Sequence, residues 1–191
     1  QTTDGRAFPG TELKIVSPEG EEIPFGDEGE LAMRGPQLFA GYLHRPDLTD
    51  AAFLSDGFLR TGDLAQMDSD GYVKITGRVK DLIIRGGLNI SPVEVEEILS
   101  GDSRITTIAL AGMPDERLGE RICAFVVPKS GSELTLEDLA DLAERSGLAK
   151  QKWPERLEIL TELPMTPTGK VQRYALKQLI TEKLTEESRT A

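Results

Sequence analysis

The sequence predicts an α+β fold, in which a small β-rich part is followed by a compact part where helices and strands interleave. Residues 11–76 alternate apolar and polar side chains in short runs separated by turn residues, which is typical of strands. Residues 135–147 instead carry apolar side chains at helical spacing. With 38% hydrophobic residues among 191, the chain has enough apolar surface for a buried core.

The β-rich part is expected to begin with a strand through Leu13 and Ile15, a turn at 17–20 and a strand through Leu31 and Met33. A short helix is expected at 49–53. The sequence DSDG at 68–71 predicts a hairpin turn that leads into a strand at 72–76. These aspartates do not complete an EF-hand, because the distal Glu of its loop is missing.

The second part is expected to contain strands at 82–84, 105–111, 121–127 and 156–160 and helices at 92–99, 135–147 and 175–184, followed by a frayed end. The sequence Ser91-Pro92-Val93-Glu94 predicts a capping box with proline at the first helical position, and Gly101 is placed to stop that helix. Thr135 and Gly147 are the expected N-cap and stop of the next helix.

The charge and the cysteine content exclude some classes of function. Lys+Arg 22 against Asp+Glu 33 gives a net charge of −11, which argues against a nucleic-acid partner. No apolar run is long enough to span a membrane and no signal peptide is visible, although the chain opens at Gln1, so its natural N-terminus is expected to lie upstream. Cys123 is the only cysteine; an apolar strand context predicts a core residue, consistent with a reducing, cytoplasmic compartment.

The stretch 57–96 concentrates the chemistry. Asp63 follows a Thr-Gly pair, so its carboxylate can come close to a ligand and accept both hydroxyls of a ribose; the alternative is a turn aspartate that caps its own backbone. Arg78 and Lys80 supply cations nearby, with a surface salt bridge as the alternative for Arg78. Gly86 and Gly87 let the backbone approach a ligand, or form only a tight turn.

A second chemical signal is PMTPTGK at 164–170. It is not a phosphate loop, because no glycine stands five residues before Gly169 and Val171 replaces the Ser or Thr. Two prolines and a glycine instead predict a stiff loop that holds Lys170 away from the surface. The alternative is an ordinary solvated lysine.

The motifs RTGD, GRxKD, GG and SPxE, in this order and spacing, resemble the C-terminal part of adenylate-forming enzymes, the superfamily of acyl-CoA synthetases, adenylation domains and luciferase. The resemblance covers nearly all of the chain and is strongest to AMP-forming carboxylic acid–CoA ligases. It implies that residues 1–78 form the β-rich terminal subdomain of the AMP-binding N-terminal body. Residues 79–191 then form the mobile C-terminal domain. The rest of that body, with its phosphate loop, is absent, so the chain is expected to be a fragment.

The resemblance also implies the role of each site residue. The sequence GELAMRGPQLFAGY resembles the lead-in to the nucleotide site, with Glu30, Arg34, Gly35, Gly41 and Tyr42 matching; for Tyr42 and Phe39, ordinary core packing is the favoured alternative. The implied set is Lys170 as the catalytic residue, Asp63, Arg78 and Tyr42 for the nucleotide, Lys80 as the hinge, and Gly86, Gly87 and Leu88 for the CoA or pantetheine tunnel. Many members carry Asp at the hinge, so Lys80 is a known variant.

The expected reaction joins a small carboxylic acid to ATP, giving acyl-AMP, and then to CoA, giving acyl-CoA and AMP. ATP or AMP, CoA and Mg²⁺ are the implied cofactors, with Mg²⁺ bound mainly through the absent body. No metal site is expected in the chain itself, since His44 has no second imidazole or thiol near it. The fragment is expected to be inactive alone, and an oligomer is possible.

Two other functions remain open. One is an adenylation enzyme that loads an aryl or amino acid onto a carrier protein, whose phosphopantetheine presents the same thiol arm as CoA. The other is a non-catalytic interaction module, against which the joint presence of Asp63, Arg78 and Lys170 argues. The acid itself cannot be read from this sequence.

Overall fold

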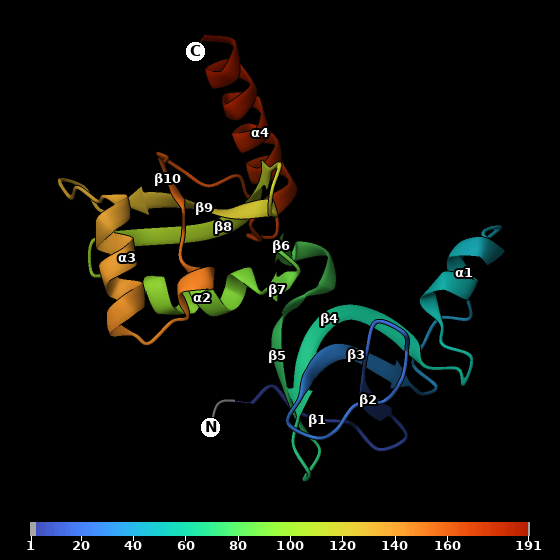
Figure 1. Cartoon of the computed structure of the whole chain (residues 1–191). Coiled ribbons are helices and arrows are strands. Elements are labelled where there is room, and N and C mark those ends of the chain that lie inside the picture. The colour runs from blue at the N-terminus through green and yellow to red at the C-terminus, as the bar shows by residue number, and fades with distance from the viewer. Residues whose placement is uncertain (1–2, 191) are drawn as a thin grey trace. The chain divides into compact units, whose positions relative to one another are not determined.

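The computed structural model describes residues 3–190 (Figure 1). The chain divides into two compact units, unit 1 (Gln1–Lys80) and unit 2 (Asp81–Ala191). The sequence places its boundary after residue 78, and the division of the structure falls after Lys80. Within the described residues, none of the helices has both the length and the apolar character needed to cross a membrane.

Unit 1 is built on one antiparallel sheet with strand order β1-β5-β4-β3-β2. Its elements are β1 (Gly5–Arg6), β2 (Glu12–Val16), β3 (Glu28–Arg34), α1 (Pro46–Ala52), β4 (Leu59–Met67) and β5 (Tyr72–Arg78). The predicted alternation is confirmed, because Ile15 and Leu31 pack in one buried cluster with Val73. The turn at 68–71 joins β4 to β5 as predicted, with Gly71 at φ 81°. Helix α1 begins earlier than expected, at Pro46, which occupies its first turn.

Unit 2 contains a five-stranded sheet with order β10-β9-β6-β7, and β8 pairs with β9. Its strands are β6 (Ile83–Arg85), β7 (Leu88–Ile90), β8 (Ile105–Asp115), β9 (Gly119–Pro128) and β10 (Arg156–Ile159); its helices are α2 (Pro92–Leu99), α3 (Leu136–Arg145) and α4 (Arg173–Thr190). Strand β10 runs parallel to β9, and the other pairs are antiparallel. The α+β class predicted from the sequence is confirmed.

Both faces of the β8–β9 ribbon are buried. Leu110 and Ile122 face a cluster formed with α2 and α3, whereas Met113 and Phe125 face a cluster formed with α4. Figure 1 shows α2 and α3 on one side of this ribbon and α4 on the other. A strand covered on both faces needs a nearly continuous apolar run, and the strands predicted at 105–111 and 121–127 lie within the observed β8 and β9, which extend further. Cys123 lies in the same core, as predicted, and its burial raises the pKa of its thiol to about 12.

Helix α2 has the predicted bounds, but the predicted capping box is wrong. Ser91 is the N-cap and Pro92 follows it, yet the Ser91 side chain makes no cap hydrogen bond. The Glu94 carboxylate accepts hydrogen bonds from Lys152 Nζ at 2.6 and 2.7 Å, so it is drawn away from the helix start. The helix ends at Ser100 in right-handed geometry, and Gly101 does not adopt the left-handed conformation of a glycine stop.

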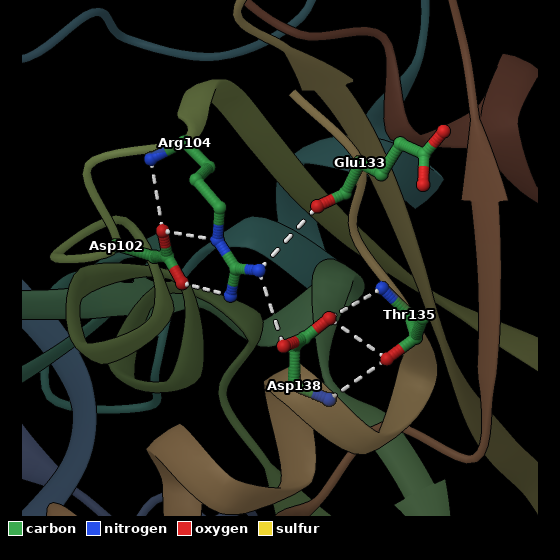
Figure 2. Close-up of polar contacts among 5 residues, drawn as sticks. All are labelled: Asp102, Arg104, Glu133, Thr135 and Asp138. Carbon is green, nitrogen blue, oxygen red and sulfur yellow. Dashed lines mark hydrogen bonds and ion pairs between the residues drawn. The ribbon is translucent and has the colours of Figure 1, made fainter. Parts of the chain in front are cut away.

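Helix α3 does begin with a complete capping box. Thr135 Oγ1 accepts from the Asp138 amide at 3.1 Å, and Asp138 Oδ2 accepts from the Thr135 amide at 2.8 Å. Figure 2 shows that Arg104 ties this box to the loop before β8, because its guanidinium binds both Asp102 and Asp138. The Arg104 guanidinium holds the pKa of Asp102 below its ordinary value, and the Thr135 hydrogen bonds do the same for the pKa of Asp138.

Helix α4 is longer than predicted at both ends. It begins at Arg173 and continues to Thr190, where fraying was expected. Glu187, in its last turns, accepts two hydrogen bonds from Arg156 of β10, at 2.9 and 2.5 Å. Lys183, one turn earlier, binds Glu158 of the same strand. These ion pairs fasten an otherwise polar end of the helix to the sheet, which the apolar periodicity could not indicate.

Candidate active site

Asp63 lies on β4 and not in a turn, so the alternative of a turn aspartate is wrong. The register of β4 against β3 shifts at this point, which leaves residues 61–63 as a bulge with Gly62 at φ 75°. The Asp63 amide donates to Thr61 Oγ1 at 3.1 Å, and the Thr61 hydroxyl donates to the Leu31 carbonyl at 2.8 Å. The bulge therefore sets the direction of the Asp63 side chain.

Glu30 fixes the other side of the same bulge. Its carboxylate accepts from the Gly62 amide at 3.1 Å and from Arg60 Nη1 at 2.6 Å, and the Glu30 side chain is only 11% exposed. The RTGD motif is thus held by hydrogen bonds to β3 through each of its first three residues, Arg60, Thr61 and Gly62. Only the fourth, Asp63, is left to present a carboxylate to a ligand.

Arg78 lies directly opposite Asp63 in the β4–β5 register. Its Nε is 2.9 Å from Asp63 Oδ1, and the two side chains are 50% and 29% exposed, respectively. The surface salt bridge weighed as the alternative for Arg78 therefore exists, and its partner is the other nucleotide candidate. The salt bridge and the nucleotide-binding role are compatible. The pair holds a carboxylate that can accept hydrogen bonds beside a cation, and both side chains are partly exposed.

Tyr42 follows β3 in a loop that folds over α1. Its amide donates to Thr49 Oγ1 at 2.9 Å, and its ring contacts Phe39 edge-on with centroids 5.0 Å apart. The Tyr42 side chain is 50% exposed and Phe39 is 40% exposed, so the prediction that both pack in the core is wrong. Within unit 1, Tyr42 is free to contact a ligand through one ring face.

Lys80, the hinge candidate, is the last residue of unit 1 and lies in a short 3-10 turn, η1 (Val79–Asp81). Val79 and Lys80 are both exposed. The junction between the units is thus a single short turn without buried residues.

Gly86 and Gly87 form the two-residue turn of the β6–β7 hairpin. The tight turn expected as the alternative for this pair is therefore present. Their φ angles are 58° and 84°, the left-handed pair that such hairpin turns need. The Gly86 amide donates to the Leu118 carbonyl at 2.7 Å, and Arg85 makes two hydrogen bonds to Glu155. The turn is consequently anchored at its start, through Arg85 and Gly86, while Leu88 on its other side is 49% exposed.

Lys170 is exposed and lies at the end of a tight hydrogen-bonded loop. The Thr166 amide donates to the Lys170 carbonyl at 2.7 Å, and the Lys170 amide donates to Thr166 Oγ1 at 3.0 Å. Met165 and Val171 form an isolated bridge below them, and Gly169 adopts φ 78°. The backbone at Lys170 is therefore braced, and its ammonium is presented to solvent.

Sequence reasoning missed a charged group behind this loop. Arg173 and Glu96 form an ion pair across 77 residues, and no local pattern could have joined them. Among residues 3–190 there is no cluster of three or more His, Cys, Asp or Glu side chains suited to a metal ion.

Comparisons with known proteins bear on both units. The family described as "AMP-binding enzyme" matches residues 1–43, and "AMP-binding enzyme C-terminal domain" matches residues 94–170. A medium-chain fatty-acid–CoA ligase of Escherichia coli is 45% identical over 97% of this chain and 33% of its own length. A salicyl-AMP ligase / salicyl-S-ArCP synthetase of Mycobacterium tuberculosis is 41% identical over 91% of this chain and 31% of its own length.

Among solved structures, ATP-bound MatB from Rhodopseudomonas palustris matches with a TM-score of 0.88 and 36% identity, over 93% of this chain and 35% of that one. The chain spans about a third of the length of the curated relatives it matches. These matches define a class, that of AMP-binding enzymes. The chain matches both parts of the AMP-binding enzyme family and is similar to acyl-CoA ligases and aryl-acid AMP ligases, in agreement with the resemblance of its motifs.

Proposed function

We propose that this chain supplies the nucleotide anchor and the mobile lysine of an AMP-forming carboxylic acid–CoA ligase. In the first step, a carboxylate oxygen attacks the α-phosphorus of ATP and pyrophosphate leaves, giving acyl-AMP. In the second step, the sulfur of CoA attacks the acyl carbon and AMP leaves. The observation that carries the proposal is the braced loop that presents Lys170, in a chain whose relatives include named CoA ligases.

Asp63 and Arg78 are assigned to the nucleotide. The Asp63 carboxylate accepts the ribose hydroxyls, which fixes the position of the α-phosphate for attack. Arg78 supplies positive charge beside the same ligand, and the Tyr42 ring covers one side of it. Support comes from the exposed Asp63–Arg78 pair at the bulge, where both side chains are already oriented.

Lys170 is assigned to the first step. Negative charge accumulates on the phosphoryl oxygens and on the attacking carboxylate, and the Lys170 ammonium stabilises it. The hydrogen bonds of the loop reduce the freedom of the backbone that carries this ammonium. An exposed lysine without such a loop would have to give up more conformational entropy when it meets the ligand.

The second step is assigned to the β6–β7 turn. A rotation about Lys80 withdraws the Lys170 loop and brings Gly86, Gly87 and Leu88 to the path of the thiol, which is ordinary hinge behaviour. Support comes from the single exposed turn at the junction and from the absence of side chains at Gly86 and Gly87.

Several components lie outside this chain. The described residues do not offer a cluster that fits Mg²⁺, so we assign Mg²⁺ on the ATP phosphates, the phosphate loop and the acid pocket to other parts of the protein. The chain of 191 residues alone should therefore show no ligase turnover and only weak affinity for ATP. A cytoplasmic location fits the single buried thiol, Cys123.

The thiol acceptor has a second candidate. The Mycobacterium tuberculosis relative is named as both an AMP ligase and a salicyl-S-ArCP synthetase, and it is nearly as similar to this chain as the CoA ligase. A carrier protein therefore remains the alternative acceptor. Competition between CoA and a phosphopantetheinylated carrier protein for supplied acyl-AMP, measured on the longer protein that carries this chain, separates the two.

The assignment of the half-reactions is tested with two variants of that longer protein. Lys170→Ala should lower carboxylate-dependent pyrophosphate exchange by on the order of 10²–10³, yet still convert supplied acyl-AMP and CoA to thioester. Gly87→Leu should do the reverse, because a side chain would obstruct the thiol path. Lys129→Ala removes another exposed lysine of unit 2 and serves as the matched control. Equal loss of both steps in both variants would make Lys170 and Gly87 structural residues.

A further inference from the structure

Arg173 is the first residue of α4 and lies three positions after Lys170. Its guanidinium donates to both carboxylate oxygens of Glu96 on α2, through Nη1 to Oε1 and through Nη2 to Oε2, the latter at 2.8 Å. Both side chains are largely buried, at 18% and 15% exposure. Burial lowers the pKa of Arg173, but the hydrogen bonds and charge of Glu96 outweigh it and leave that pKa above its ordinary value.

The pair also binds the free edge of β8 at Leu110. The Leu110 amide donates to Glu96 Oε1 at 2.6 Å, and Arg173 Nη1 donates to the Leu110 carbonyl at 3.0 Å. Within the described residues β8 pairs only with β9, so this edge has no neighbouring strand. Glu96 and Arg173 together supply the acceptor and the donor that a strand would have supplied there.

The same guanidinium reaches the start of unit 2. Arg173 Nε lies 3.7 Å from Asp81 Oδ2, and Asp81 is the first residue of the unit. One side chain thus contacts α2, β8 and the last residue of the junction turn. Only two residues separate Arg173 from Lys170 in the chain. One of them, Gln172, donates its amide to the Pro164 carbonyl at 2.8 Å and so ties this segment back to the loop.

We propose that the Arg173–Glu96 pair positions Lys170, by fixing the base of its loop to the edge of β8 and to the first residue of unit 2. Arg173 is a positioning residue and does not touch the ligand. The inference rests on the proposed role of Lys170. It adds that the catalytic ammonium and the junction are mechanically connected within unit 2, so that the loop moves with the whole unit.

The chemistry of the pair explains why arginine occupies this position. A planar guanidinium can donate to two carboxylate oxygens and to a carbonyl at the same time, in a fixed geometry. A lysine ammonium keeps the charge but loses this fork. Arg173→Lys should consequently retain part of the connection, and Arg173→Gln should lose most of it.

The test is residue-resolved amide hydrogen exchange by NMR on the 191-residue chain. The reporters are the hydrogen-bonded amides of Thr166, Gly169, Lys170 and Gln172 in the loop, with Phe125 of β9 as the core reference. In Arg173→Gln and in Glu96→Gln, exchange at the loop reporters should become about tenfold faster while Phe125 stays within about twofold of the wild type. Arg173→Lys should show a smaller increase.

The matched control is Lys177→Gln. Lys177 lies on the same helix, one turn further on, and forms an ion pair with Glu120 while remaining half exposed. It should leave the loop reporters unchanged. The proposal is overturned if Arg173→Gln leaves the loop amides unchanged, or if Phe125 accelerates by the same factor, because the pair would then support only the fold. If Arg173→Gln does not fold, Arg173→Lys decides by the same comparison.

A second measurement separates this proposal from the proposed function. In the longer protein, Arg173→Gln should lower kcat for pyrophosphate exchange with KM for ATP unchanged, and Arg173→Lys should restore part of it. An unchanged kcat would overturn the positioning role. A wild-type protein without any exchange activity would overturn the function instead, and the amide exchange would still decide whether Arg173 holds the loop.

Discussion

Asp63 and Arg78 form an ion pair that contributes little to stability at their exposure, since such surface pairs contribute about 0–1 kcal/mol. Its importance is geometric. The strand register places the two side chains opposite each other, and the Thr61–Gly62 bulge turns Asp63 toward Arg78. The ion pair seen in the structure and the proposed nucleotide-binding pair are therefore the same two residues.

Gly87 provides a residue-scale test that does not depend on activity. Its φ is 84°, and a Cβ built there would meet no atom within 4 Å, so an added methyl group is penalised only by backbone strain. Gly87→Ala should lower the free energy of unfolding in urea by about 1 kcal/mol. Gly87→Asn, whose side chain tolerates the left-handed region, is the matched control and should lose less. Equal stability of all three chains would contradict the turn geometry.

Helices α2 and α3 have similar start signals in the sequence but different caps in the structure. At α3 nothing competes for Asp138 except Arg104, which binds its other oxygen, so the capping box forms. At α2, Lys152 takes the Glu94 carboxylate and Ser91 is buried. A local motif thus specifies where a helix starts, whereas tertiary contacts decide whether its side chains close the cap.

The cap of α3 should be measurable. Thr135→Ala removes the acceptor for the Asp138 amide and should destabilise the chain by about 1 kcal/mol. Glu144→Gln, an exposed change in the last turns of the same helix, should stay within about 0.5 kcal/mol of the wild type. Thermal or urea unfolding monitored by circular dichroism checks both. A Thr135→Ala chain as stable as the control would mean that Arg104 alone holds the start of α3.

The attachment of α4 to β10 should depend on pH. Burial alone would raise the pKa of Glu158, but hydrogen bonds from Lys183 and Arg156 outweigh it and hold that pKa below the ordinary 4.5. Because the folded pKa is lowered, the carboxylate contributes stability above about pH 4.5 and loses it as the pH falls through the folded pKa. The urea midpoint should therefore drop as the pH falls below about 4.5.

Glu158→Gln isolates this contribution. The variant should lose about 2 kcal/mol at neutral pH and approach the wild type as the pH falls through the folded pKa of Glu158, where the wild-type carboxylate becomes protonated. Glu162→Gln changes an exposed glutamate nearby and is the control, with the pH profile of the wild type. Parallel pH profiles of Glu158→Gln and the wild type would contradict the argument.

At the scale of the whole molecule, each unit has hydrophobic clusters of its own. Unit 1 is organised around Ile15 and Leu31, and unit 2 around the two faces of β8 and β9. The turn between them buries no residue. Each unit therefore has a core of its own, which the proposed rotation about Lys80 requires.

Trypsin should therefore cut first at the junction. Arg78 and Lys80 are both exposed, and cleavage there should release a stable fragment that begins at or just before Asp81. Mass spectrometry of a limited digest identifies the fragment. In the Arg78→Gln/Lys80→Gln variant this fragment should be delayed while other cuts keep their rates. A wild-type junction as resistant as the β8–β9 core would count against a hinge.

Short sequence motifs predicted much of this structure, whereas the features that depend on contacts between distant segments were not predicted. The bounds of α2 and the turn at 68–71 follow from proline, glycine and aspartate at fixed offsets, which act over a few residues. The candidate residues of the site were likewise found in short motifs. The Arg173–Glu96 pair, the strand order of unit 2 and the outer turns of α4 depend on contacts between distant segments, so no pattern in the sequence contains them.

The edge of β8 has a consequence for behaviour in concentrated solution. An eleven-residue strand with an open edge is a template onto which a strand of another molecule can add, which leads to aggregation. At Leu110 the two backbone groups on that edge are already bonded to Glu96 and Arg173, so an incoming strand finds neither a donor nor an acceptor at its centre. The same ion pair therefore removes one donor and one acceptor from those that edge-to-edge pairing through β8 would need.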